Sequence, residues 1–417
     1  MNSIKKIKIP TELLKLARVF PVDLYVVGGY VRNQLLGIDE GDVDLCSSLT
    51  VDKLSKVAEE CGFSVKNKNK ALGTAKLVFD DKTYDYATFR REKYGDDKSH
   101  KPCEVEFIQD IEEDSKRRDF TINAIYYNIN KETMCDFYNG YYDLRKGIVR
   151  AIDSAEAVMQ NDGERILRMV RVAGELGFKI DKNTLAAAYK NIDNIHGISA
   201  DRISLELRKI LYCDKRYEVK TRKFTLSDCL KLMNKMSIWK CFGLDFERVN
   251  YNMVKKVKER FLGLYIDMID TVNPASVSYF LGKLLKHVSL SQKQLMQTIN
   301  IISGYYDALN RKSNKQYFFK YFDNFEFIYD LLLSKSKMIA QKYQFFYKYI
   351  ISYHLVIKQK DLKITTRDLK SRYPSLPPKM YNDVLNEILS DVFDGKYPNE
   401  REIILEELEN KMTIKKN

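Results

Sequence analysis

The chain has 417 residues, 45% of them hydrophobic, which excludes wholesale disorder, and its length predicts two or more domains. No apolar run reaches the roughly 18–20 residues that a membrane span needs, and no long apolar stretch follows the lysines near Met1, so we expect a cytoplasmic protein with neither a membrane span nor a signal peptide. The net charge of +13 is uneven, because residues 1–214 sum to −1 and residues 215–417 to +14.

Residues 10–150 mix short β-type runs with helical ones. The apolar run Leu24–Val27 ends in two glycines, and a helical stretch follows as far as Leu36, which predicts a strand, a glycine turn and a helix. Asp42–Cys46 alternates acidic and apolar residues, as expected of a strand with both carboxylates on one face.

A hairpin follows in the same half of the chain. Residues 77–89 predict two strands joined by a polar turn at Asp80–Lys82. Further short strands are expected within 121–127 and 135–138. The first 150 residues therefore predict a mixed α/β unit.

After about residue 154 the pattern becomes helical. Apolar residues recur every three or four positions through 156–178 and again in 204–211. From residue 215 on, most segments are amphipathic helices, interrupted by one breaker cluster at Pro374–Lys379. This basic half is rich in Tyr and Phe, most densely in 317–328, which favours a polyanion-binding unit joined to a catalytic one. The alternative is an ordinary solvated lysine surface with the aromatic residues in a core.

The sulfur and imidazole groups show no metal-binding spacing. The seven cysteines include no Cys-x-x-Cys pair, and the four histidines form no His-x-x-x-His motif. We therefore expect reduced thiols, as in a cytosolic protein, and neither a disulfide framework nor a zinc site. A metal hydrolase centre built from histidines is likewise not expected.

Asp42 and Asp44 are the first candidates for chemistry. Alternate residues on a strand project side by side, so two carboxylates at this spacing can hold hard cations. Upstream, Gly28 and Gly29 predict bare amides at a helix N-terminus, with Arg32 on the first turn, a combination that can cradle a triphosphate. An Asp-x-Asp alone is more often an exposed strand edge, but the glycine turn about ten residues earlier favours a metal site.

These motifs resemble those of the class II tRNA nucleotidyltransferases, the CCA-adding enzymes, and of the bacterial poly(A) polymerases, within the wider DNA polymerase beta superfamily. The resemblance covers about residues 20–210 and rests on Gly28–Arg32, Asp42–Leu45, Arg117–Ala124, Asp136–Leu144 and Arg165–Phe178. It implies an α+β fold, in which an N-terminal nucleotidyltransferase head with a small mixed sheet precedes an all-α neck, body and tail. The expected domains are the catalytic head (1–150), the neck that recognises the base (151–214), the body (215–320) and the tRNA-binding tail (321–417).

The resemblance implies a metal-dependent reaction. Asp42 and Asp44 would be catalytic carboxylates that hold two Mg²⁺ ions, the expected cofactor. One ion would activate the 3′-hydroxyl of the RNA, and the other would bind the triphosphate and stabilise the pyrophosphate leaving group. A third catalytic carboxylate is expected on the neighbouring hairpin, where Asp85 stands. The alternative for Asp85 is a solvated strand residue.

The family's base-reading motif is Glu-Asp-x-x-Arg, which reads Asn161-Asp162-Gly163-Glu164-Arg165 in this chain. Asp162 and Arg165 are three apart, so we expect both on one helix face, where they would read the Watson–Crick edge of C or A. Asn161 replaces the first glutamate and Gly163 replaces the usual Pro or Ala. These departures concern the rigidity of the site more than its chemistry.

A ribose-reading motif is implied at Arg117–Asp119. Asp119 would accept a hydrogen bond from the 2′-hydroxyl, and Arg118 would support the phosphate or the ribose. Asn123 would bind the nucleotide or serve as a buried structural amide. Arg168 and Arg171, on the helix after the base-reading motif, would either face the nucleotide or clamp the head to the neck.

Residues 91–104 resemble the flexible loop of full CCA-adding enzymes, which CC-adding relatives lack, although its arginine-rich part reads Lys98–Lys101 here. We therefore expect template-independent addition of C, C and A to tRNA from CTP and ATP, with the tRNA acceptor and T arms bound by the basic half. A poly(A) polymerase and a partial CC- or A-adding enzyme stay open, and a non-catalytic RNA-binding relative is the rival from another class. The sequence implies no protein partner.

Overall fold

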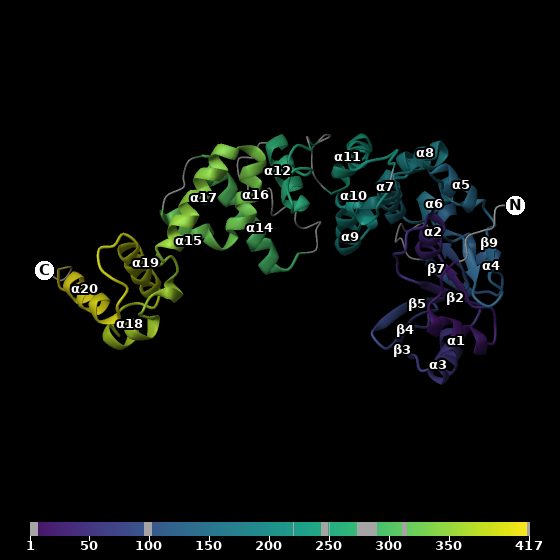
Figure 1. The fold of residues 1–417 in the computed structure, drawn as a ribbon, viewed down its shortest axis with the longest axis horizontal. Coiled ribbons are helices and arrows are strands. Elements are labelled where there is room, and N and C mark those ends of the chain that lie inside the picture. Colours follow the sequence, from purple (N-terminus) through teal and green to yellow (C-terminus); the bar gives the residue numbers. More distant parts are fainter. Residues whose placement is uncertain are drawn as a thin grey trace. The chain divides into compact units, whose positions relative to one another are not determined.

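The computed structural model describes residues 7–95, 102–219, 221–242, 249, 251–272, 290–310 and 315–414 (Figure 1). The chain divides into two compact units. The first runs to Tyr251, and the second contains Asn252–Asp270 and the helices from residue 290 on. The expected domain limits at 150 and 214 fall inside the first unit and the limit at 320 inside the second, so these finer boundaries stay predictions.

A seven-stranded mixed sheet forms the head of the first unit, in the order β3-β4-β5-β2-β1-β8-β9. Its strands are β1 (Tyr25–Val27), β2 (Asp44–Ser47), β3 (Ser64–Asn69), β4 (Thr74–Phe79), β5 (Lys82–Thr88), β8 (Tyr126–Asn128) and β9 (Thr133–Cys135). All neighbours are antiparallel except β2 and β5, which run parallel. This parallel pair brings together segments that are some forty residues apart in sequence.

Three helices accompany the sheet: α1 (Thr11–Val19), α2 (Gly29–Leu36) and α3 (Val51–Glu60). The apolar sides of α1 and α3 pack with the sheet residues in one core, which includes Leu16, Val26, Leu45, Leu54 and Leu77, all at most 1% exposed. Burial of such side chains stabilises the head by about 1.5–3 kcal/mol each. The interior strands β2 and β5, which carry Asp44 and Asp85, are thereby held rigidly.

The two turns predicted in the head are confirmed, whereas three of the predicted strands are displaced. The glycine turn joins β1 to α2, and the hairpin turns where Asp80 has a φ of +52°. The strand expected from Asp42 begins only at Asp44. Most of the segment 121–127, expected as a strand, is instead a 3₁₀ turn, η1 (Thr121–Asn123), and β8 begins only at Tyr126. The strand expected within 135–138 lies earlier, because β9 ends at Cys135.

The rest of the first unit is mainly helical. It contains α4 (Ile111–Ser115), α5 (Gly140–Lys146), α6 (Ala155–Asn161), α7 (Glu164–Leu176), α8 (Lys182–Lys190), η2 (Ile192–Gly197), α9 (Ala200–Leu211), α10 (Cys213–Arg216), α11 (Leu226–Lys235) and η3 (Ile238–Phe242). Two small sheets accompany them, an antiparallel hairpin of β6 (Arg90–Tyr94) with β7 (Pro102–Phe107) and a parallel pair of β10 (Ile148–Val149) with β11 (Lys179–Ile180). The helix expected over 156–178 is broken at Asp162-Gly163.

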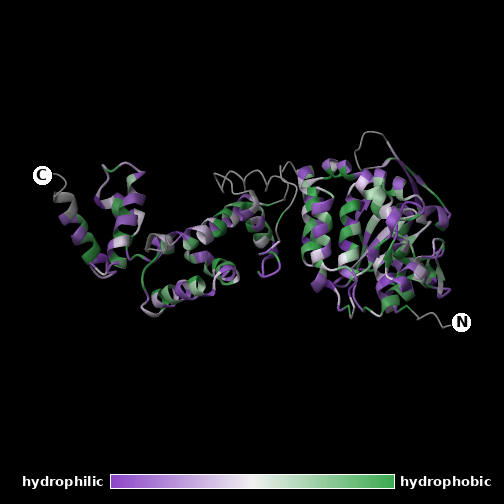
Figure 2. Cartoon of the chain, turned by 90° about the horizontal axis from the view of Figure 1, so that it is seen from above, coloured by the Kyte–Doolittle hydropathy of each residue, from purple (hydrophilic) through white to green (hydrophobic). Residues whose placement is uncertain are grey.

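The second unit is all-helical in the part that the structure describes. Its helices are α12 (Arg260–Val272), α14 (Gln292–Leu309), α15 (Lys315–Tyr321), α16 (Phe325–Lys335), α17 (Lys337–Ser352), α18 (Thr366–Arg372), α19 (Met380–Phe393) and α20 (Arg401–Ile414), with short 3₁₀ turns η5 (Phe322–Asn324) and η6 (Gln359–Asp361). Figure 2 shows hydrophobic and hydrophilic residues alternating around these helices. The predicted fold class, a mixed α/β head followed by an all-helical remainder, is confirmed.

The aromatic run at 317–328 lies largely inside the second unit. Tyr317, Phe318 and Phe325 are at most 8% exposed, and the rings of Phe318 and Phe325 both stack on Tyr343, with centroids 5.7 and 4.9 Å apart. These rings therefore form a core. Within the described residues, no helix is both long and apolar enough to cross a membrane.

Candidate active site

Asp44 and Asp85 meet at the junction of β2 and β5. The two residues are register partners in this parallel pair, at the first position of β2. Asp42 lies two residues before the strand, on an exposed segment. Lys76 of β4, the register partner of Asp85 on the other side, holds its carboxylate through an ion pair of 2.9 Å. The structure thus brings two of the three predicted catalytic carboxylates side by side.

The electrostatics of Asp44 favour a bound cation. Burial raises the pKa of Asp44 to about 6, and the nearby carboxylates of Asp85 and Asp42 also raise it, although Arg118 opposes this. A half-buried carboxylate beside two others is stabilised by positive charge, and oxygen donors are what Mg²⁺ prefers. The residues present therefore fit a divalent cation of the magnesium type.

The glycine turn closes tightly against the acidic residues. Gly28 has a φ of +80°, and a Cβ atom there would lie 3.4 Å from Oδ2 of Asp44. Gly29 begins α2. Arg32 is buried, and its guanidinium donates to the Oδ1 atoms of Asn33 and Asn123. Arg32 stabilises the turn through these two asparagines. We had expected its guanidinium to face a triphosphate, but the guanidinium is buried.

A cleft of about 370 Å³ opens beside the acidic pair. Its lining includes Asp44 and Asp85 together with three cationic side chains, those of Lys76, Arg117 and Arg118. Facing carboxylates and guanidinium groups can hold a metal ion and phosphate oxygens in one place. The arrangement suits a polyphosphate ligand.

Sequence reasoning missed the groups that hold these arginines. Asp114 is fully buried and accepts from Nε of Arg117 (2.9 Å) and from the hydroxyl of Tyr126 (2.8 Å). The same tyrosine accepts from Nε of Arg118 at 2.7 Å, and its ring lies 4.8 Å below that guanidinium. The available signal was spacing, because Asp114 lies three and four positions before the two arginines.

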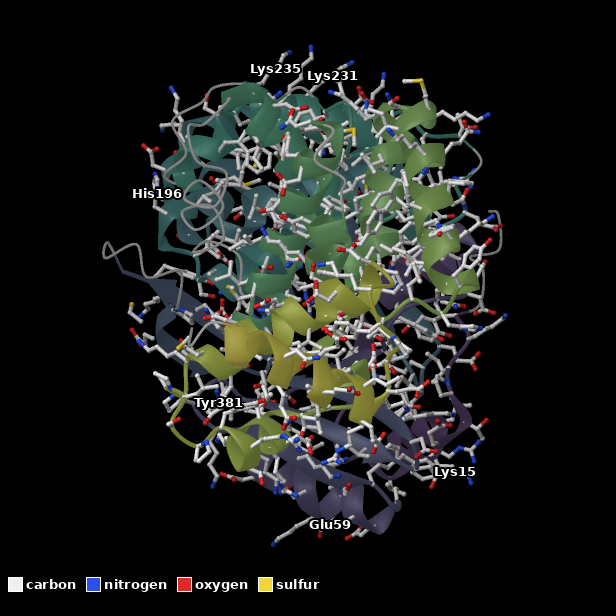
Figure 3. The ribbon with its side chains drawn as sticks, turned by 90° about the vertical axis from the view of Figure 1, so that its left-hand side faces the viewer. Lys15, Glu59, His196, Lys231, Lys235 and Tyr381 are labelled. Atoms are coloured by element: carbon white, nitrogen blue, oxygen red, sulfur yellow. The ribbon has the colours of Figure 1, made fainter. Side chains whose placement is uncertain are left out.

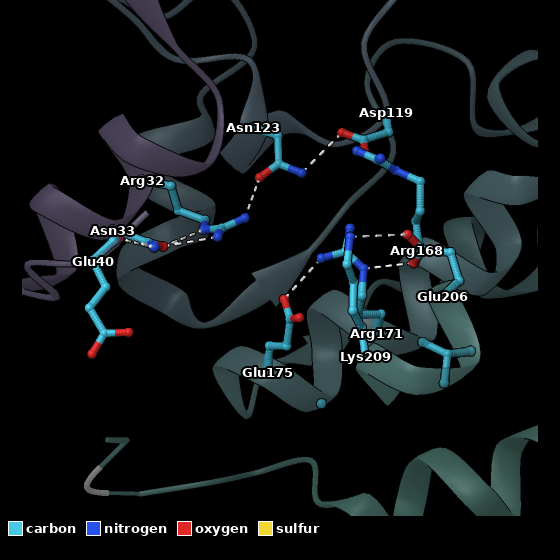
Figure 4. A network of polar contacts seen from close by, with 12 residues as sticks. Arg32, Asn33, Glu40, Asp119, Asn123, Arg168, Arg171, Glu175, Glu206 and Lys209 are labelled. Carbon is cyan, nitrogen blue, oxygen red and sulfur yellow. Dashed lines mark hydrogen bonds and ion pairs between the residues drawn. The ribbon is translucent and has the colours of Figure 1, made fainter. Parts of the chain in front are cut away.

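Asp119 is the centre of a buried polar network (Figure 4). Its Oδ1 accepts from Nδ2 of Asn123 at 3.0 Å, and its Oδ2 accepts from Nε and Nη2 of Arg168 at 2.9 and 2.6 Å. Burial raises the pKa of Asp119, but the ion pair with Arg168 and the bond from Asn123 outweigh it and hold the pKa well below its usual range. Asp119 is therefore a fixed acceptor, and Asn123 links it to Arg32.

Arg168 and Arg171 of α7 have different surroundings. Arg168 clamps this helix to the head through Asp119. Arg171 bonds Glu206 of α9 (2.7 Å) and Glu175 of its own helix (3.1 Å), so its partners lie within the helical region (Figure 4). Of the two roles considered for this pair, the contacts favour the structural one.

The base-reading motif does not form a single helix face. Asp162 has an extended backbone with a φ of −148°, ends α6, and accepts from the backbone N–H of Glu164 at 3.0 Å. Arg165 is 7% exposed and donates to the backbone oxygens of Val158 (3.3 Å) and Arg117 (2.7 Å). The expectation of a shared helix face is wrong, because the helix breaks between them.

A second cleft, of about 200 Å³, lies at this break. Its lining includes Asn161 and Arg165 of the motif, Glu92 and Tyr94 of β6, and Arg117. Arg117 therefore lines both clefts. The residues of the expected flexible loop at 96–101 lie outside the described part of the chain, and its flanks form β6 and β7.

Steric contact explains why a glycine stands at position 163 of the motif. A Cβ atom on Gly163 would lie 2.4 Å from the backbone oxygen of Asn194 in η2. Asn194 in turn donates from Nδ2 to the backbone oxygen of Gln160 at 3.0 Å, at the end of α6. Only glycine admits so close a backbone approach, so η2 supports the break that separates Asp162 from Arg165.

Two models of protein families match the chain. The model "Poly A polymerase head domain" matches residues 24–150, and "Probable RNA and SrmB- binding site of polymerase A" matches residues 177–219. The first match spans the sheet and the carboxylates, and the second covers the helices that follow α7.

Similar proteins align along nearly the whole chain. A CCA-adding enzyme of Staphylococcus aureus is 26% identical over 405 residues, which is 94% of this chain and 95% of the relative. The crystal structure of the Bacillus stearothermophilus CCA-adding enzyme in complex with CTP superposes with a TM-score of 0.73 at 21% identity, covering 97% of this chain and 98% of that one. The Thermotoga maritima CCA-adding enzyme complexed with tRNA gives a TM-score of 0.55 at 22% identity over 96% and 94% of the two chains. The chain therefore has a head that matches the poly(A) polymerase head domain, and it is similar to CCA-adding enzymes along nearly its whole length.

Proposed function

We propose that this protein adds C, C and then A to the 3′ end of tRNA without a nucleic-acid template, using CTP and ATP and releasing pyrophosphate. The observation that carries the proposal is the register pairing of Asp44 with Asp85 at a cleft that also contains Arg117 and Arg118. Its support from the comparisons is that relatives aligned over almost the whole chain are named CCA-adding enzymes.

In this proposal Asp42, Asp44 and Asp85 are the catalytic carboxylates, and Asp42 and Asp44 are the metal ligands. Two bound Mg²⁺ ions would supply activation of the 3′-hydroxyl and stabilisation of the pyrophosphate leaving group. Lys76 neutralises part of the charge on Asp85, which lowers the repulsion that Asp85 exerts on Asp44.

The chain's cationic and amide groups would bind the triphosphate. Arg118 lies in the cleft with its guanidinium fixed by Tyr126, so little side-chain entropy is lost when it contacts a phosphate oxygen. The backbone N–H groups that follow Gly28 and Gly29 open α2 and favour an anion there. Arg32 acts through Asn123 as a positioning residue.

In this proposal Asp119 recognises the ribose, and Asp162 with Arg165 recognises the base. Asp119 is ionised and held in place, so it can accept from a ribose 2′-hydroxyl, provided that Arg168 keeps its orientation. We assign base recognition to Asp162 and Arg165, which flank the α6–α7 break. Arg171 fixes α7 against α9 and supports them indirectly.

An incorporation assay distinguishes the candidate functions. Full-length protein with Mg²⁺ is given labelled CTP, ATP or both, and tRNA that lacks its 3′ terminus or ends in C or CC. Ordered addition that stops at three nucleotides supports the proposal. A long tail of A indicates a poly(A) polymerase, addition that halts after CC or requires a CC end indicates a partial enzyme, and no incorporation indicates a binding relative.

We also propose that the basic helical half binds the acceptor and T arms of tRNA. Residues 311–380 carry a net charge of +10, and lysines such as Lys320, Lys342 and Lys348 are exposed around the aromatic core. Each phosphate contact releases counterions, so log affinity should fall with log salt by about 0.7–0.9 per contact. Lys342→Gln with Lys348→Gln should flatten that slope, whereas the same exchange at Lys53 and Lys56 of α3 should not. An unchanged slope in the first variant would reject this surface.

A further inference from the structure

Outside the cleft residues, one cluster of metal-binding side chains stands out in the described part of the chain. The ligand atoms of Asp193, His196 and Cys241 all lie within 4.8 Å of one another. Asp193 and His196 belong to η2, and Cys241 belongs to η3, which packs against η2. The sequence analysis expected no such site, since Cys241 is forty-five residues from His196.

The local backbone explains how the three groups converge. A 3₁₀ helix has three residues per turn, so residues i and i+3 lie above one another, and Asp193 and His196 therefore share one face of η2. Cys241 approaches from the other segment, with its Sγ 3.7 Å from the backbone oxygen of Ile192. The thiol is 8% exposed, while Asp193 and His196 are exposed to solvent, and Figure 3 labels His196 at the surface.

We infer that Asp193, His196 and Cys241 bind one divalent transition metal ion of the zinc class. One sulfur, one imidazole nitrogen and one carboxylate oxygen are the donor types that Zn²⁺ takes, and three protein ligands leave a fourth position for water. Metal–ligand distances of about 2.0–2.3 Å place tetrahedral ligands roughly 3.3–3.8 Å apart, so the exposed Asp193 and His196 side chains need to move by only about 1 Å.

This site differs in chemistry from the acidic pair on the sheet. Asp44 and Asp85 offer only oxygen, which suits Mg²⁺, whereas a thiolate and an imidazole discriminate against Mg²⁺ in favour of Zn²⁺. The two sites can therefore be loaded separately. Within η2, Asn194 lies between the two ligands and contacts Gly163 and Gln160, so a bound ion would stiffen the support of the α6–α7 break.

Metal titration of the full-length chain tests the inference. After chelator treatment and gel filtration into buffer with excess Mg²⁺, the thiolate-to-cobalt charge-transfer absorption should saturate at one Co²⁺ per chain, and Zn²⁺ should displace the Co²⁺. His196→Gln changes an exposed side chain and should lower the affinity at least tenfold with an unchanged circular dichroism spectrum. Cys241→Ser should remove the charge-transfer band.

Two variants serve as controls for unspecific thiol or imidazole binding. Cys103→Ser changes an exposed cysteine of β7, and His354→Gln changes an exposed histidine of the second unit. Both should retain the band and the stoichiometry. A band that persists in Cys241→Ser, an affinity unaffected by His196→Gln, or no Co²⁺ binding by the wild type would overturn the assignment. None of these readouts depends on nucleotide addition, so the result is independent of the proposed function.

Discussion

Asp44 and Asp85 face each other across the one parallel strand pair of the seven-stranded sheet. Parallel pairing sets both carboxylates on the same side at the same height, which neither strand could achieve alone. Lys76 of the neighbouring strand β4 forms an ion pair with Asp85. The acidic site is thus a property of the sheet topology.

Loss of the Asp44 carboxylate should stop nucleotide addition while tRNA binding is preserved. Asp44→Asn keeps the shape of the side chain and removes its charge, so kcat should fall by at least about 10²-fold, the order lost when one electrostatic contact to the reacting groups is removed. Asp42→Asn should act in the same direction. Asp81→Asn, in the exposed hairpin turn, is the matched control and should retain activity. Substantial turnover by Asp44→Asn would reject the metal-ligand assignment.

The raised pKa of Asp44 predicts a dependence of stability on pH in the absence of metal. Since the folded pKa is about 6 and the unfolded one about 3.8, the folded state binds more protons between these values, and stability falls as the pH rises through this window. At pH 8 with chelator, Asp44→Asn should therefore be more stable than wild type, by on the order of 1–3 kcal/mol. At pH 4 the difference should nearly vanish. Urea unfolding at both pH values measures the difference in unfolding free energy between the variant and the wild type. The same difference at pH 8 and pH 4 would contradict the raised pKa of Asp44.

Substitutions of Asp119 and Arg168 should have non-additive effects on the free energy of unfolding. Arg168→Met leaves a buried carboxylate without its partner and should cost about 3 kcal/mol of unfolding free energy. Asp119→Asn in the same chain removes the stranded charge, so the double variant should recover part of the loss. A double-mutant cycle by urea unfolding gives the interaction energy. Strict additivity would show that the pair does not hold α7 to the head.

Base choice should depend on Arg165. If its guanidinium reads the nucleotide, Arg165→Ala should reduce the preference for C and A over U and G by about 1–3 kcal/mol of discrimination. The measurement is kcat/KM for each of the four nucleoside triphosphates. A uniform loss for all four would mean that the bonds to the backbone oxygens of Val158 and Arg117 are its whole role.

A methyl group at the helix break should be poorly tolerated. Gly163→Ala forces a Cβ atom against the backbone of Asn194, and such overpacking costs about 1–3 kcal/mol. Thermal unfolding should show a lower Tm together with impaired nucleotide addition. Gln160→Ala, an exposed change at the end of α6, is the control. A Tm equal to wild type would show that η2 moves aside at no cost.

Sequence reasoning succeeded where the signal was local. The glycine turn before α2 and the hairpin turn at Asp80 follow from neighbouring residues, and the structure has the predicted turns there. It failed where the cause lies far away in sequence. The break at Gly163 depends on the backbone of Asn194, thirty-one residues later, and no helical periodicity could indicate it.

The same limit applies to side chains that act in groups. Spacing rules detect metal ligands that are close in sequence, so Cys241 beside His196 was not detectable before the packing of η3 on η2 was known. Charge counting found the basic half but could not separate exposed lysines from the buried rings of Phe318 and Phe325. Burial of those rings required the packing of α15, α16 and α17.

Arg117 connects the two clefts of the candidate active site. Its side chain is bound by Asp114 and lines both clefts, while its backbone oxygen accepts from Arg165. A change at this position therefore alters both clefts together. Directed evolution toward a new nucleotide preference should accordingly leave Arg117 untouched and accumulate its changes at Asn161 and Asp162, which line or flank only the second cleft.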